Sequence, residues 1–101
     1  MYLIQLLLPL ADNQGTEFPE ATLRGIHKEL SDHYGGLTAY TRSPAKGLWR
    51  NAGGEQTDDI VIVEVMTETL DEDWWRTFRI RLERLLRQEK VVIRAQDIKS
   101  L

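Results

Sequence analysis

The polar side chains that could bind a ligand or take part in catalysis lie inside apolar stretches of this chain. Glu64 lies between Ile62 and Met66 at alternating positions of one apolar run, and Gln5 interrupts another such run. Arg94 occupies a similar position in a third run near the carboxyl end. A carboxylate in apolar surroundings must be paired, or its pKa rises. These three residues therefore form a candidate polar cluster that could bind a polar ligand or supply a general base next to a cation.

Two interpretations of this polar cluster stay open. It is either a ligand or catalytic site, or an ion pair at a subunit interface that fixes how two subunits align. Tyr40 and Arg42, from a neighbouring predicted strand, are candidate members of the same cluster. A second candidate site is aromatic, because Trp49 and Trp74 have the flat apolar surfaces that line the mouths of pockets. Packing in the core or in a hairpin is the alternative for both tryptophans.

Residue types exclude several kinds of chemistry. The chain has 101 residues and no cysteine, which removes disulfides, thiolate nucleophiles and zinc–thiolate sites. The two histidines, His27 and His33, lie on one predicted helix at a spacing that cannot form an i, i+4 metal pair. Neither glycine pair matches a phosphate-binding loop. We therefore expect no metal and no cofactor.

Charge gives no indication of a nucleic-acid or membrane partner. The net charge is −3 and the isoelectric point is near 5.3, so nothing global attracts a polyanion. Five arginines load the region from 76 to 87, but acidic residues share it, which is typical of a solvated helix face. The predicted third strand also lacks the exposed aromatic side chains with which some sheets of this kind stack on bases.

Periodicity predicts six elements in the order strand, helix, strand, strand, helix, strand. Their approximate ranges are 2–10, 17–34, 37–42 with a resumption at 47–50, 59–67, 71–90 and 91–95. Thr16 is a candidate cap of the first helix, and Gly35 is its stop signal. Asp71 is the expected cap of the second helix. The first apolar run lacks the basic start of a signal peptide, so we expect a buried strand and a cytoplasmic protein.

This order of elements predicts the fold. Two β-α-β halves with right-handed crossovers give an α+β domain of the ferredoxin-like kind, with a four-stranded antiparallel sheet and both helices on one face. The first and third strands are the most apolar and should therefore be central. No linker or composition shift divides the chain, so residues 1–101 are expected to form one domain.

The open face of this sheet should be polar, and it is not. In the first and third predicted strands, both sets of alternating positions are largely apolar. An uncovered apolar face usually marks an interface or a ligand groove, so we expect the chain to form a homodimer through this face. The alternative is that residues 43–58 or the C-terminal tail fold back over the face.

The segment 35–42 reads Gly-Gly-Leu-Thr-Ala-Tyr-Thr-Arg and is followed by Pro44, Gly47-Leu48-Trp49 and Asp58-Asp59. Together with Phe18-Pro19 and Trp74-Trp75, it resembles a family of short, uncharacterised bacterial proteins along nearly the whole chain. The Gly-Leu-Thr and Gly-x-Trp portion is also similar to a second domain family, often exported. The resemblance implies a bacterial protein with a ferredoxin-like fold, and it assigns no activity and no catalytic residue.

Two classes of function remain open from the sequence. The first is a homodimeric module that binds a small molecule or a partner protein through the open sheet face. The second is a cofactor-independent enzyme of the dimeric α+β barrel type, similar to a monooxygenase or isomerase, that uses Glu64 and Arg94 with help from Gln5. The sequence does not identify a substrate for either class.

Overall fold

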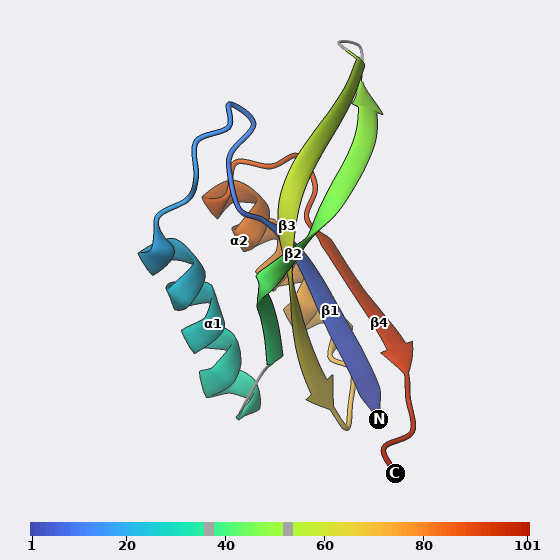
Figure 1. Ribbon diagram of the computed structural model, residues 1–101. Coiled ribbons are helices and arrows are strands. Elements are labelled where there is room, and N and C mark those ends of the chain that lie inside the picture. Colours follow the sequence, from blue (N-terminus) through green and yellow to red (C-terminus); the bar gives the residue numbers. More distant parts are fainter. Residues whose placement is uncertain (36–37, 52–53) are drawn as a thin grey trace.

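The predicted order of elements is confirmed (Figure 1). The computed structural model describes residues 1–35, 38–51 and 54–101, and the side chains outside 36–59. The elements are β1 (Tyr2–Pro9), α1 (Glu20–Tyr34), β2 (Thr38–Asn51), β3 (Gly54–Thr67), α2 (Glu72–Leu85) and β4 (Val92–Asp97). The strands form one antiparallel four-stranded sheet in the order β2-β3-β1-β4, so the two most apolar strands are central, as predicted.

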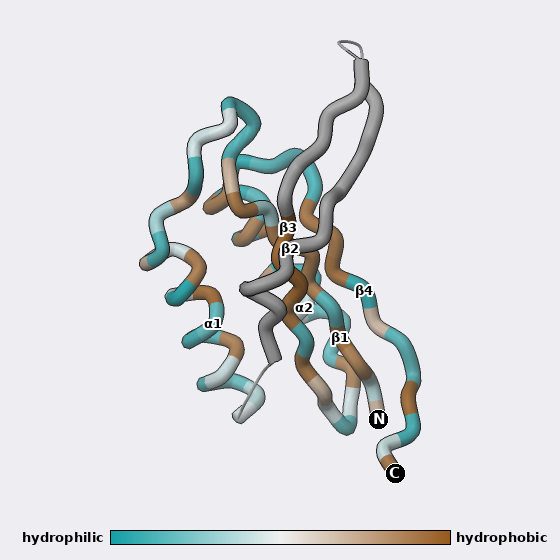
Figure 2. The backbone as a smooth tube through the Cα atoms, in the orientation of Figure 1, coloured by the Kyte–Doolittle hydropathy of each residue, from teal (hydrophilic) through white to brown (hydrophobic). Residues whose placement is uncertain are grey.

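One face of the sheet carries the hydrophobic core. Alternate residues of β1 and β3 are at most 1% exposed there, because both helices pack over them. These sheet residues are Ile4, Leu6, Leu8, Val61, Val63 and Val65. From the helices, Ile26, Leu30, Trp75, Phe78 and Leu82 complete the same cluster. Figure 2 shows the apolar character running along β1, between the helices and the open side of the sheet.

Helix α1 starts later than predicted. It begins at Glu20 with Pro19 at the N-cap position, and no side chain caps it. Thr16 is therefore not the cap. It belongs to a turn in which Asp12 Oδ1 accepts a hydrogen bond from the Thr16 amide at 3.0 Å. The predicted stop at Gly35 is confirmed, because Gly35 adopts a left-handed conformation with φ of 79° and donates to the Ser31 carbonyl.

Helix α2 begins as predicted and ends earlier. The Asp71 carboxylate accepts a hydrogen bond from the Trp74 amide at 3.1 Å, which caps the helix. The helix ends at Leu85, and Arg87 then turns the chain with a φ of 51°. Glu83 Oε2 accepts a hydrogen bond from the Val91 amide at 2.9 Å and so holds the start of the last segment against the helix.

The β2–β3 hairpin is longer than predicted. Residues 45–51 pair with 54–60, and a register shift between Tyr40 and Ala45 separates this part from the rest of β2. Figure 1 shows the two strands running on beyond the end of β1 as a ribbon. The alternative that residues 43–58 fold back over the open sheet face is therefore wrong. The C-terminal tail lies beside the N-terminus, where the Ile98 amide donates to the Met1 carbonyl at 2.9 Å.

Candidate functional site

The predicted polar row across the open face is present. Gln5 on β1 is in register with Glu64 on β3 and with Arg94 on β4, so the three side chains share one line across the sheet. Gln5 Nε2 donates a hydrogen bond to Glu64 Oε2 at 2.7 Å. Arg94 Nε donates to Gln5 Oε1 at 2.9 Å. The Gln5 amide thus connects the carboxylate to the guanidinium, because its nitrogen donates to the first and its oxygen accepts from the second.

The strand period explains this row. Successive side chains point to opposite faces of a strand, and Leu6 on the core side fixes Gln5 on the open side. The partner strands carry Glu64 and Arg94 at the matching positions. The sequence expectation that Glu64 must be paired is met by the Gln5 amide. What the row does for the protein, as a ligand site or as an interface, stays a prediction.

Most of the other described open-face side chains around the row are apolar, and Gln96 on β4 is the polar exception. Met66 is 60% exposed and Val92 is 38% exposed, whereas Val65, on the core side of the same strand as Met66, is 1% exposed. We call the surface formed by the following residues the open apolar face: Leu3, Leu7, Ile60, Ile62, Met66 and Val92. No helix covers it (Figure 1). The polar row crosses this face, so any molecule bound there meets apolar surface together with one carboxylate and one guanidinium.

The other predicted members of this cluster are only partly described. The backbone of Tyr40 pairs with Ile62 in the sheet, and Arg42 lies at the register shift of β2. Trp49 pairs with Gln56 in the extended part of the hairpin. The side chains of Tyr40, Arg42 and Trp49 lie outside the described residues, so their roles stay predictions.

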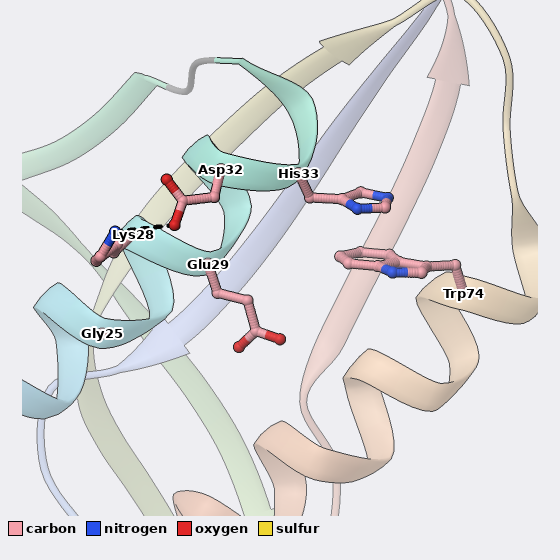
Figure 3. Close-up of a pocket in the computed structure, with 6 residues that line it drawn as sticks. All are labelled: Gly25, Lys28, Glu29, Asp32, His33 and Trp74. Atoms are coloured by element: carbon pink, nitrogen blue, oxygen red, sulfur yellow. Dashed lines mark hydrogen bonds and ion pairs between the residues drawn. The ribbon is translucent and has the colours of Figure 1, made fainter.

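Trp74 lies far from the polar row, on the helix side of the molecule. Its ring stacks on His33 of α1 with centroids 4.2 Å apart and ring planes within 7° (Figure 3). The Trp74 ring also stacks on Phe78, with centroids 4.9 Å apart. Trp74 and His33 line a shallow hollow between the two helices, together with Lys28 and Asp32, which form an ion pair at 2.9 Å. The two predicted pocket aromatics, Trp74 and Trp49, thus belong to different elements, α2 and β2.

Burial shifts the pKa values of two titratable side chains of α1. Burial lowers the pKa of His27, whose Nε2 is buried without a hydrogen-bond partner among the described residues. Burial raises the pKa of Tyr34, whose ring packs parallel to Trp75 at 5.4 Å. Both pKa shifts result from packing against apolar surface, and neither shift indicates a role in proton transfer.

Neither a metal site nor a membrane span is found within the described ranges. No group of three or more His, Asp or Glu side chains is placed there to hold a metal ion. In the same part of the chain, no helix is long and apolar enough to cross a membrane.

Sequence patterns missed one contact that shapes the helix side. Arg81 of α2 forms an ion pair with Glu29 of α1, across the gap between the helices. The sequence interpretation placed Arg81 on a solvated face, and it remains partly exposed. No local signal predicts this pair, because its members are separated by 52 positions and belong to different elements. Only the packing of the two helices on a common sheet brings them together.

Known structures resemble this fold. A scan against protein-family models finds no match, and a search of curated proteins finds none either. Among solved structures, a phage SAM lyase in complex with S-methyl-5'-thioadenosine is similar at a TM-score of 0.69 and 12% identity, covering 95% of this chain and 80% of that one. The divalent cation tolerance protein Cut A1 from Thermus thermophilus matches at a TM-score of 0.64 and 17% identity, covering 99% and 86%.

A third similar structure is CutA from Pyrococcus horikoshii, at a TM-score of 0.62 and 14% identity over 100% of this chain and 87% of that one. At these identities the likeness concerns the fold, and the ferredoxin-like α+β architecture expected from the sequence is shown. The resemblance to a family of short bacterial proteins gains no support from the family scan and stays a prediction. The chain has the fold shared by CutA proteins and a phage SAM lyase.

Proposed function

We propose that this chain is a self-associating module, at least a homodimer, whose subunits meet through the open apolar face with their polar rows opposite one another and a small molecule held between the rows. The observation that carries this proposal is the combination of an uncovered apolar sheet face with the Glu64–Gln5–Arg94 row across its middle. A solvent-facing antiparallel sheet normally carries polar side chains on its free side, so apolar residues there indicate a buried contact.

The row also favours a second copy of the same chain as the occupant. It carries a carboxylate at one end, a guanidinium at the other and a neutral amide in the middle. A two-fold axis near Gln5 would set Glu64 of one copy against the partner's Arg94, and the reverse. Two-fold interfaces require this kind of self-complementary surface. A row with one sign of charge at both ends would repel its own copy.

The decisive measurement is the mass in solution, by light scattering after size exclusion at low micromolar concentration. We expect the wild type to be a dimer or larger. Leu7→Glu places a charge in the centre of the open apolar face and should give a folded monomer. Ile80→Glu is the matched control, because Ile80 is also apolar and 43% exposed but lies on α2. A wild-type monomer of 11.7 kDa would refute self-association.

A charge exchange tests the role of the row in that assembly. Arg94→Glu leaves two carboxylates along the row and should weaken association by about tenfold or more. Adding Glu64→Arg reverses both ends and should restore association, because the exchanged row is again self-complementary. If the double variant associates no better than Arg94→Glu, the row does not meet its copy in the proposed way.

The small-molecule part of the proposal is supported by the fold. One protein of similar fold, the phage SAM lyase, was solved with S-methyl-5'-thioadenosine. We propose nucleoside thioethers of this kind as the first ligands to test, by calorimetric titration of the wild type and of Glu64→Gln. Saturable binding that is lost in Glu64→Gln supports a site at the row. Binding that is equal in both proteins would place the site elsewhere.

An enzymatic role is the second candidate, favoured by the same similarity to a lyase. Here Glu64 would act as the base and Arg94 would neutralise an anionic group, with Gln5 fixing the distance between them. Incubation with S-adenosylmethionine and detection of S-methyl-5'-thioadenosine by mass spectrometry tests this candidate. Product formation by wild type but not by Glu64→Gln supports catalysis, and no product from either protein rejects this reaction.

A further inference from the structure

A second surface on the opposite side of the sheet has the features of a binding site. Between α1 and α2 lies a half-open hollow with a volume of about 560 Å³, within the range of roughly 300–1,000 Å³ common for small-molecule sites. Its floor is apolar and is formed by the edges of the core residues Ile26, Phe78 and Leu82, which are at most 3% exposed, while Leu85 on α2 is 54% exposed at its side. We call this hollow the inter-helix groove.

Gly25 lines this groove without contributing a side chain. It lies inside α1 and lines both the groove and the neighbouring hollow at Trp74. A glycine in a helix interior is less favourable than alanine. Its φ is not positive and an added Cβ would meet no atom within 4 Å, so the backbone and the immediate neighbours do not require a glycine here. What the missing side chain does is leave the space between the helices empty.

The charges along the groove favour an anion. Arg81 and Glu29 neutralise each other by their ion pair, and Arg81 also lies over the Phe78 ring at 5.2 Å. Arg84 is exposed at the rim, and its guanidinium makes no hydrogen bond or ion pair with the described residues. The groove therefore combines an apolar wall with one available guanidinium. Glu29 lines both the groove and the Trp74 hollow, and its ion pair with Arg81 bridges the two helices there, which suits a short ligand better than a long partner helix.

We propose that the inter-helix groove binds a small amphipathic anion, an organic acid with an apolar body such as a medium-chain fatty acid. The apolar body would lie against the exposed Leu85, above the floor formed by Phe78 and Leu82, and the acid group would meet Arg84. This site lies on the covered side of the sheet and is separate from the polar row and the open apolar face. Binding there is therefore independent of self-association.

The test uses a fluorescent probe of the same chemistry, 8-anilinonaphthalene-1-sulfonate. We expect it to bind the wild type at one site per chain and to be displaced by decanoate, but much less well by decanol. Gly25→Met extends a side chain into the groove and should weaken probe and decanoate binding by about tenfold or more. It should not lower the unfolding temperature, because Met is a good helix former and Gly25 has open space around it. Arg24→Met is the control, an exposed position of α1 outside the groove.

The anion part of the proposal is tested at Arg84. Arg84→Gln should weaken decanoate about fivefold while leaving decanol unchanged, since only the charged group loses its partner. Arg76→Gln removes the same charge from a side chain that already pairs with Asp73 at 3.1 Å and lies outside the groove, so it should have no effect. Equal weakening by both variants would mean that the probe senses only net charge and would overturn the assignment of Arg84.

Two results would overturn the site itself. One is wild-type protein that shows no saturable binding of probe or decanoate. The other is probe binding that survives Gly25→Met and disappears in Leu7→Glu, because the probe would then occupy the open apolar face. Light scattering on Gly25→Met distinguishes binding in the groove from self-association through the open apolar face, because this variant should have the same number of subunits as the wild type.

Discussion

Both faces of the sheet carry apolar residues, but only one face is covered by the helices. On the covered face, Leu6 and Val63 are fully buried by the two helices. On the open face, Leu7 and Ile62 are their sequence neighbours, and both keep some exposure in the single chain. On the first face the apolar side chains are buried within the single chain, whereas on the second the apolar surface that stays exposed can be buried only by another molecule. Apolar content alone therefore does not tell a core from an interface, and the position of the helices decides which is which.

The largest effect that separates the two faces is expected from truncating adjacent leucines. Leu6→Ala leaves a cavity in the core and should lower the free energy of unfolding by about 3 kcal/mol. Leu7→Ala should cost clearly less in a dilute, dissociated sample, and its main effect should be weaker association. Denaturant unfolding at two protein concentrations checks this. A concentration-independent loss for Leu7→Ala as large as that of Leu6→Ala would mean that the open face is part of the core.

The next effect concerns the helix that covers the core. Asp71→Ala removes the side chain that accepts from the Trp74 amide, and it should lower the free energy of unfolding by about 1 kcal/mol. Because α2 is on the covered face, the subunit number should not change. Thermal unfolding and light scattering measure the two quantities. Asp73→Ala is the comparison in the same turn, where the carboxylate makes only an exposed contact with Arg76.

A stabilising change is expected at the groove. Gly25→Ala should raise the free energy of unfolding by about 0.5–1 kcal/mol, because alanine is the better helix former and its Cβ meets no neighbour. Chemical unfolding of the variant measures the change. A loss of stability would show that the space at Gly25 is needed for packing, and the reason given for the open groove would then fail.

The smallest effect is a pH dependence on the helix side. Burial lowers the pKa of His27 in the folded chain, so the unfolded chain binds this proton more readily. The free energy of unfolding should therefore fall as pH drops below the ordinary histidine value of 6.5, until the lowered folded pKa is passed. His27→Gln should flatten this part of the stability profile. Equal slopes in wild type and His27→Gln would contradict the assignment.

The alternation of side chains along the strands made the composition of the open face predictable. Contacts between residues far apart in the sequence did not follow from any sequence pattern. The row of Gln5, Glu64 and Arg94 follows from the period of two together with the strand order, which the sequence of elements implies. The Arg81–Glu29 pair depends on how far apart two helices settle on a sheet, and no spacing encodes that distance.

The predicted ends of some helices and strands were wrong for local reasons. The apolar period of α2 continues to Leu86, although the helix ends at Leu85 and the chain turns at Arg87. The sequence predicted a resumed strand only at 47–50 and a third strand only from 59, yet residues 45–51 pair with 54–60 as a long hairpin. Ladder hydrogen bonds can form with residues of almost any type, so composition underestimates the length of such a ribbon.

The ring column of His33, Trp74 and Phe78 gives the helix side its own optical signal. An imidazole lies face to face with the Trp74 indole, at 4.2 Å between centroids, so the surroundings of this indole depend on the contact between α1 and α2. Separation of the two helices would break this contact and should change the emission of Trp74. In a variant that keeps Trp74 and replaces Trp49 and Trp75, tryptophan emission would then report, without any label, whether the two helices are held together.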